Sequence, residues 1–327
     1  MIVPWICGRP LRLLAATAFV TCFAAAGVST PLNTVRGDVL PEGKNEIKVK
    51  WTSRTFDGRY DANGDIKDFA NSESRKSNVI TLGANYGSVG GQEICLELPF
   101  VMRTHVLSSA SPTSPGATKS ISGLGDITLL GKSQLMSNQD IAGASFSMGV
   151  KFPTGRSLFN TVPDKLPSGS GTWDFISGMY TQERRGVMLL CANVEYHVRF
   201  SKTAGRFGGY DIKAGNVKVT PGDMITASLA AEYPASDLIK IIAEANAEYA
   251  YSGKASYVDG GNDAFNDIRR LGEPEYFLEN SKSILLSIQA LLALSPAFGA
   301  YFSYQVPVLA SNAFSGGGIQ LGLSLQF

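Results

Sequence analysis

The sequence predicts an all-β protein: a closed antiparallel transmembrane β-barrel of about twelve strands, preceded by a cleaved signal peptide. Three observations predict it. Segments of about ten residues alternate between apolar and polar side chains, as tilted membrane strands do. The connections between them alternate between short and long. The final segment shows the pattern most clearly, because one face of a strand would carry Ile319, Leu321, Leu323, Leu325 and Phe327.

The composition excludes several classes of protein. The 327 residues include 29 Lys and Arg and 28 Asp and Glu, so no basic excess points to nucleic acid. Charged residues make up 17% of the chain, below the roughly 25% of soluble domains. Beyond the N-terminal region, no apolar run reaches the ~18 residues that a spanning helix needs. A barrel distributes its apolar residues by alternation, so this composition suits it.

The N-terminus has the features of an export signal, assigned to residues 1–26. Arg9 and Arg12 precede a short apolar run, and Ala24 and Ala26 fit a small-residue cleavage site, so the mature chain is expected to start near residue 27. An uncleaved anchor and a lipoprotein attached through Cys22 are the alternatives. Residues 27–44 form either a short periplasmic lead or a plug that enters the lumen, and residues 45–327 form the barrel.

Twelve segments fit membrane strands. Their expected bounds are 45–55, 78–87, 93–103, 125–136, 141–152, 172–182, 187–200, 223–233, 238–251, 282–294, 297–308 and 317–327.

The connections support a barrel more strongly than the segments do. Short links rich in Gly, Pro, Asn and Asp alternate with long ones, and an even number of strands places both termini on one side. Outer-membrane barrels have short periplasmic turns and long extracellular loops. Because strands in lipid must pair all their backbone groups, the last strand is expected to pair with the first near Ile47–Trp51.

Alternation also assigns side chains to the lumen. Charge is tolerated on a water-filled inner face and costly on the lipid face. The mixed signs indicate either a salt-bridged interior that stabilises the barrel or a solute path with a charge preference. The residues expected to line the lumen are Lys48, Lys50, Arg54, Glu97, Arg103, Asp126, Lys132, Lys151, Glu195, His197, Arg199, Lys240, Glu244 and Glu248.

Aromatic side chains near segment ends are expected to form interfacial girdles or to pack as ordinary core residues. They are Tyr86, Phe100, Phe152, Phe200, Tyr233 and Phe298.

Little in the chain suggests catalysis or metal binding. Outside the signal segment the cysteines are Cys95 and Cys191, on strands that are not neighbours, so free thiols are expected. No cofactor and no metal are expected, although Asp259, Asn262 and Asp263 could bind a cation. A serine hydrolase would need a histidine, and the chain has two, His105 beside a serine-rich loop (Ser108, Ser109, Ser111) and His197.

Three segments resemble a known family. They are GLGDITLLGK at 123–132, GVKFPTG at 149–155 and GSGTWDFISGMY at 169–180. Together they resemble the outer-membrane barrels named for the meta-pathway of phenol degradation. The resemblance implies a barrel through which small or apolar compounds pass. Phe327 resembles the C-terminal signal that the barrel-assembly machinery reads.

The first two segments also suggest a physical role. Alternation places Asp126 and Lys151 on the inner face of hairpin partners, so a cross-strand ion pair is expected. The loop that follows Lys151 either completes the fold or folds inward and narrows the pore.

The sequence as a whole favours a passive, porin-like channel or transporter in the outer membrane of a Gram-negative bacterium, with outer-membrane lipid and a small-molecule solute as partners. The solute could be aromatic or apolar. The alternatives are surface binding or adhesion through loops such as Val258–Asn266, a structural barrel, and an outer-membrane lipid hydrolase.

Overall fold

The computed structural model describes residues 37–69, 73–106, 118–138, 142–157, 166–204, 206–207, 210–211, 217–257, 280–295 and 297–327. The expected signal segment, Ser108, Ser109, Ser111 and the 258–266 loop with Asp259, Asn262 and Asp263 lie outside these residues.

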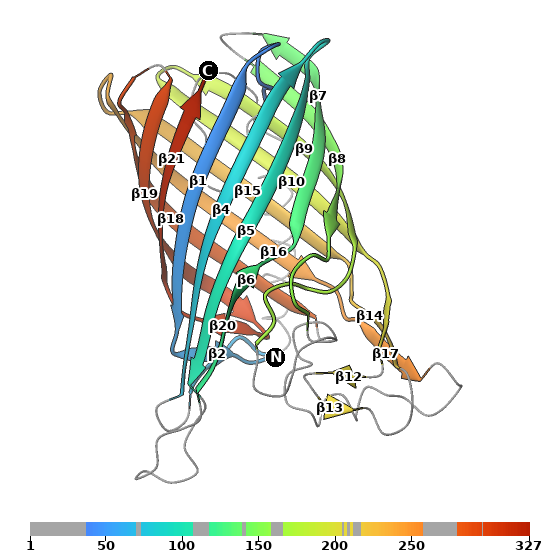
Figure 1. Cartoon of the computed structure of the whole chain (residues 1–327). Coiled ribbons are helices and arrows are strands. Elements are labelled where there is room, and N and C mark those ends of the chain that lie inside the picture. The colour runs from blue at the N-terminus through green and yellow to red at the C-terminus, as the bar shows by residue number, and fades with distance from the viewer. Residues whose placement is uncertain are drawn as a thin grey trace, which may run out of the picture.

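A closed antiparallel barrel forms the body of the molecule (Figure 1). The main sheet has 13 strands, and β6 (Thr118–Leu124) continues β7 along β5, which leaves twelve in the closed ring. In chain order these are β1 (Asn45–Phe56), β4 (Ser74–Ser88), β5 (Gln92–Val106), β7 (Ile127–Asn138), β8 (Ala142–Phe152), β9 (Asp174–Arg185), β10 (Met188–Arg199), β15 (Met224–Pro234), β16 (Ile239–Ala250), β18 (Ser281–Ala293), β19 (Phe298–Ser311) and β21 (Gly318–Gln326).

The twelve strands confirm the segments predicted from the sequence, with bounds that differ by a few residues. The first and last strands close the ring as expected, since Ile47 pairs with Leu325 and Trp51 with Leu321. Backbone bonds between Asn45 and Phe327 of 2.8 Å and 3.0 Å extend this seam to the chain end. The seam leaves no open sheet edge in the lipid.

The short and the long connections lie at opposite ends of the barrel, as predicted. The C-terminus and the short turns lie at one end, at the top of Figure 1, and the long connections lie at the other. These are called the short-turn end and the loop end, which in outer-membrane barrels are periplasmic and extracellular. The turn between β4 and β5 contains Gly90 and Gly91 at φ of 71° and 70°. Tight hairpins need this left-handed backbone, which glycine adopts without strain.

The two faces of the wall differ as a membrane barrel requires. On the outer face, apolar side chains are exposed, including Val194, Ile241 and Leu323. Four of the expected girdle aromatics are also exposed: Tyr86, Phe100, Phe200 and Tyr233. Among the described residues, no helix is long and apolar enough to cross a membrane.

A small sheet covers part of the loop end. It consists of β20 (Ala313–Ser315), β2 (Gly58–Tyr60) and β3 (Ile66–Asp68). The β2–β3 turn is held by the Asp61 carboxylate, which accepts backbone N–H bonds of 3.0 Å from Asp65 and 2.9 Å from Asn63. The bond from Asp65 is the main cause that lowers the pKa of Asp61.

Aromatic residues attach this cap to the barrel. The rings of Phe56 and Phe314 lie 5.2 Å apart, and the Arg75 guanidinium lies 4.6 Å from the centroid of the Phe314 ring. Arg75 and His105 both contact Glu73, at 3.2 Å and 2.9 Å. Two further small sheets lie at the same end. One has three strands, β11 (Lys202–Ala204), β14 (Val217–Thr220) and β17 (Lys254–Tyr257), and the other has two, β12 (Arg206–Phe207) and β13 (Tyr210–Asp211).

The assignment of inner and outer faces predicts effects of different size for two arginine substitutions. Val194→Arg puts a charge in lipid and is expected to lower the free energy of unfolding by about 2–4 kcal/mol. Thr226→Arg lies on the inner face between Glu195 and Glu248, its partners on the flanking strands, and is expected to change stability by less than about 1 kcal/mol. Denaturant unfolding in lipid vesicles measures both, and equal losses would contradict the face assignment.

Candidate functional site

The inner wall of the barrel is the candidate site, and uncharged polar side chains cover much of it. They project from successive strands, and most are almost fully buried. The set comprises Ser145, Ser147, Asn193, Ser228, Ser287, Gln289, Ser303, Gln305 and Gln320. Within the described residues, several of their buried polar atoms have no hydrogen-bond partner, such as Ser145 Oγ, Asn193 Oδ1 and Ser303 Oγ. Such groups suit a lumen that holds water or polar solute, because a dry apolar filling would leave them without hydrogen-bond partners, which costs free energy.

Several of the predicted lumen residues form ion pairs with neighbours on the same wall. Lys48 Nζ lies 2.8 Å from Glu46, Lys240 Nζ 2.7 Å from Glu232, and Lys132 Nζ 3.9 Å from Glu93. Lys151 pairs with Asp174, and His197 Nε2 lies 3.3 Å from Glu195. The signs alternate around the wall, so no single-sign ring forms among these residues.

Other predicted residues contact amides and hydroxyls instead. Arg54 donates to Gln305 Oε1 at 3.0 Å, and Gln320 donates to the same oxygen at 3.0 Å. Glu244 accepts bonds from Ser287 at 3.2 Å and Gln289 at 2.8 Å.

The remaining predicted residues differ in exposure. Glu97 and Glu248 are exposed, and Lys50 is half-buried. The Arg199 backbone donates to Asp223 at 3.1 Å at the loop end.

The expected ion pair between Asp126 and Lys151 is wrong. Lys151 pairs with Asp174 on β9, its direct neighbour in the register. Asp126 lies in the break between β6 and β7, so its carboxylate turns toward the β8–β9 connection. There it accepts a bond of 3.1 Å from the Gly155 N–H and two of 2.6 Å from the Ser170 N–H and hydroxyl.

This carboxylate brings together the three segments that carry the family resemblance. Asp126 belongs to the first segment, Gly155 ends the second, and Ser170 lies in the third. Glycine is needed at 169, because a Cβ there would collide with the Asp126 carboxylate. The three motifs therefore encode one structural unit, which ties the β8–β9 connection to the wall.

The same connection also reaches another strand. Arg103 Nη1 on β5 donates to the Pro167 carbonyl at 2.8 Å, and Leu166 and Ser157 are buried. These contacts agree with a connection that folds inward rather than away from the barrel.

A chain of hydrogen bonds crosses three neighbouring strands inside the barrel. Ser147 Oγ lies 2.7 Å from Tyr180 Oη, which donates to Glu195 at 2.9 Å. His197 contacts the other oxygen of Glu195. Among the described residues, the hydrogen-bond partner of His197 is this glutamate and not a serine, so the Ser–His contact of a hydrolase is not formed at His197.

Residues 37–43, called the inner strap, lie along the inner wall at the short-turn end. Side chains of the wall hold the strap backbone: Gln134 donates to the Gly37 carbonyl at 3.1 Å and accepts from the Val39 N–H at 2.9 Å. Glu93 accepts from the Leu40 N–H at 3.1 Å. These bonds involve main-chain groups, which is why no residue pattern in the strap indicated them.

Both ends of the strap are anchored. Asp38 accepts from Lys132 through its carbonyl and from Gln182 through its carboxylate. Gly43 donates to the Gly87 carbonyl at 2.8 Å. From Gly37 to Gly43 the strap thus crosses β9, β8, β7, β5 and β4 in order before it enters β1.

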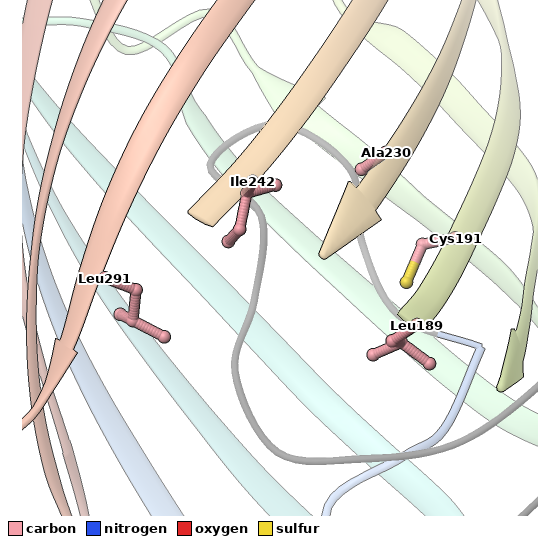
Figure 2. Packing of buried hydrophobic residues seen from close by; sticks show 5 residues of the cluster. All are labelled: Leu189, Cys191, Ala230, Ile242 and Leu291. Atoms are coloured by element: carbon pink, nitrogen blue, oxygen red, sulfur yellow. The ribbon is translucent and has the colours of Figure 1, made fainter. Parts of the chain in front are cut away.

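Apolar side chains interrupt this polar wall near the short-turn end of β10, β15, β16 and β18. Five apolar side chains form a cluster, called the apolar inner patch (Figure 2). Tyr301 packs against it. Its members are Leu189 and Cys191 on β10, Ala230 on β15, Ile242 on β16 and Leu291 on β18.

Sequence reasoning missed this patch. The prediction of the inner face rests on the charged residues of these strands and leaves out the apolar residues of the same parity. The signal was present as Leu189 and Cys191, which share the parity of Glu195. Cys191 and Cys95 are free thiols on β10 and β5.

The chain matches one protein family over most of its length. Residues 52–323 fit the profile described as putative MetA-pathway of phenol degradation. The protein belongs to this family. A search of curated proteins found no match.

One solved structure supports the fold of this family member. A crystal structure of the COG4313 outer membrane channel from Pseudomonas putida F1 is 14% identical, covers 92% of this chain and 100% of its own, and superposes with a TM-score of 0.65. The NanC porin is 8% identical, covers 85% of this chain and 98% of its own, and has a TM-score of 0.45. The first likeness establishes the fold of an outer-membrane barrel, and the identities are too low to carry over a solute.

The role of Asp126 can be tested by removing its carboxylate. In Asp126→Ala, amide exchange at Gly155 and Ser170 is expected to be at least about tenfold faster, since losing one hydrogen bond to a charged group costs about 1.5–3 kcal/mol. Hydrogen-exchange mass spectrometry of the folded barrel measures this. Asp237→Ala, at a short turn, is the matched control and should leave these amides unchanged. Unchanged exchange in Asp126→Ala would show that the loop is held by other contacts.

Proposed function

We propose that this protein is a passive outer-membrane channel for small solutes, including aromatic or apolar ones. One observation carries the proposal: a closed barrel whose inner wall is polar over much of its surface while its outer wall is apolar. Barrels of eight strands fill their bore with side chains, and barrels of sixteen leave a wide aqueous channel. Twelve strands fall between these, which favours a narrow conduit.

The inner-wall residues support a path with little net charge preference. Cationic and anionic side chains are interspersed, and many are already paired, as Lys240 is with Glu232. Paired charges exert a weak field on a passing solute, whereas a ring of one sign would select strongly. The path is therefore proposed to pass neutral or amphipathic solutes, lined by the charged residues predicted from the sequence.

The family description and the apolar inner patch support the aromatic or apolar solute class. Leu189, Ile242 and Leu291, on β10, β16 and β18, give the inner wall an apolar region that the passage of ions and water does not require. The apolar inner patch favours an apolar solute over water beside it.

Planar-bilayer recording tests the channel. Refolded protein is expected to give discrete conductance steps of one main size. Glu248→Lys removes an exposed inner-face anion and should shift the reversal potential under a KCl gradient toward anion selectivity. Asp237→Lys makes the same charge change at a short turn and is the control. A barrel that inserts but never conducts would contradict the proposal.

Uptake into proteoliposomes tests the solute class. Small neutral aromatics are expected to enter faster than equally sized charged sugars, after subtraction of the rate in protein-free vesicles. Ile242→Asn, which makes the apolar inner patch polar, is expected to reduce this preference by about threefold or more. Equal rates with and without protein would remove the aromatic class while leaving the channel itself intact.

A further inference from the structure

A row of apolar side chains marks where the lipid face of β4, β5 and β6 ends, close to the loop end (Figure 1). Ile80, Phe100 and Leu124 are register partners across these three strands and are 39%, 43% and 43% exposed. In the two rows beyond them, toward the loops, the outward-facing side chains become mostly polar. This is the level at which the hydrocarbon of a membrane gives way to lipid headgroups.

A pocket of about 420 Å³, called the rim pocket, lies at this level. Its outward-facing lining residues supply an amide, three hydroxyls and a thioether, and they belong to the two rows that follow the apolar row. They are Asn78, Met102, Thr104, Ser120 and Ser122. Arg156, from the β8–β9 connection, adds a guanidinium group, and Arg103 and Ile121, from the inner-face positions between them, also border the pocket.

Two cations at the rim pocket have no carboxylate partner. Arg156 is exposed, and so is Lys76, which is the direct register partner of Thr104. Within the part of the chain that the structure describes, neither forms an ion pair, whereas Lys151 and Lys240 in the lumen both do. No acidic side chain is among the described residues that line the pocket. Unopposed positive charge at headgroup level attracts phosphate groups.

An open strand edge adds main-chain donors. Among the described strands, β6 pairs with β5 alone. The Leu124 carbonyl faces away from β5, because it accepts a bond of 2.8 Å from the Ser168 hydroxyl. Alternate residues of a strand direct their main-chain groups the same way, so the N–H groups of Ser122 and Ser120 also face this edge. Neither N–H has a hydrogen-bond partner among the described residues, which leaves both available to an acceptor such as a phosphate oxygen.

We propose that the rim pocket binds the phosphate group of a glycolipid in the outer leaflet of the outer membrane. Arg156 and Lys76 supply the opposite charge, and the N–H and hydroxyl of Ser122 donate to the phosphate oxygens. The hydroxyl of Thr104 bonds the sugar, and an acyl chain lies over Phe100.

The position of the rim pocket favours a lipid over a soluble anion. Successive rows of one face lie about 7 Å apart, so an acyl chain of a lipid whose phosphate is in the pocket reaches Phe100 and Leu124. Exposed ion pairs are individually weak, so a free phosphate binds poorly. The leaflet holds a lipid phosphate at this level, and its acyl chain adds contacts that a free phosphate lacks.

Native mass spectrometry of the full-length exported protein in neutral detergent tests the site. With bisphosphorylated lipid A as the probe, one retained lipid per barrel is expected. Lys76→Gln with Arg156→Gln removes both charges and should reduce the bound fraction at subsaturating lipid at least fivefold, with heat-modifiable gel mobility showing that the barrel is folded. Lys254→Gln with Lys282→Gln removes two exposed charges from other strands at the same end. This matched control should bind as the unaltered protein does.

Two further probes separate the parts of the ligand. Lipid A from which both phosphates have been removed should bind at least fivefold less than the bisphosphorylated form. Inorganic phosphate at the same concentration should not compete with the lipid. Equal binding of the phosphate-free lipid, or an equal loss in both double variants, overturns the inference. Competition by inorganic phosphate also overturns it, because the pocket would then be a site for a soluble anion.

A photocross-link locates the lipid in native outer membranes. With p-benzoylphenylalanine at position 122, irradiation is expected to give a glycolipid adduct, identified by mass spectrometry of the linked peptide. Lys76→Gln with Arg156→Gln should reduce this adduct at least fivefold, while an adduct formed from position 282 should be unchanged by the same double variant. A loss of equal size at both positions, or no loss at position 122, would show that the adduct reports general contact with the leaflet and would refute the site.

Discussion

The backbone hydrogen bonds of the seam between β1 and β21 are the constraint on which the rest of the structure depends. In hydrocarbon, an unpaired N–H or carbonyl costs several kcal/mol, so a sheet that enters lipid must close on itself. Once it closes, each strand has one face toward lipid and one enclosed face. Because successive side chains alternate, each residue's position along the strand decides which of these faces it occupies. The seam pairs nine residues of β1 with β21, from Glu46 to Arg54.

Closure also determines what the enclosed face can tolerate. Its polar side chains are arranged in short local groups: lysine with glutamate, arginine with glutamine, and tyrosine between serine and glutamate. Each group links two or three consecutive strands of the ring, so the contacts that neutralise charge also tie neighbouring strands together. An interior of this kind stabilises the barrel and agrees with the proposed solute passage, because water can hydrate the polar groups that the pairs leave open.

Two segments that are not strands shape the lumen. The β8–β9 connection is held at the loop end by Asp126, and the inner strap is held at the short-turn end by Gln134, Glu93 and Lys132. In both cases a side chain on the wall bonds the main chain of the segment. The path of each segment therefore depends on few of its own side chains. The exceptions are Asp38 and Ser170, whose side chains bond residues outside their segment, and glycines such as Gly37 and Gly169, where main chain or a carboxylate approaches too closely for a Cβ.

The sequence by itself determined the strands, their number, the sorting of turns and loops, and the pairing of Ile47 with the last strand. These follow from a period of two and from the rule that membrane strands must close, and both can be read along the chain. Only the tertiary structure decided the partners of Asp126 and Lys151, the path of residues 37–43 and the gathering of Leu189, Ile242 and Leu291. The physical reason is that parity states which face a side chain occupies but not its height on the barrel or its neighbours across strands. Those depend on register, on the break between β6 and β7, and on main-chain contacts that no side-chain pattern records.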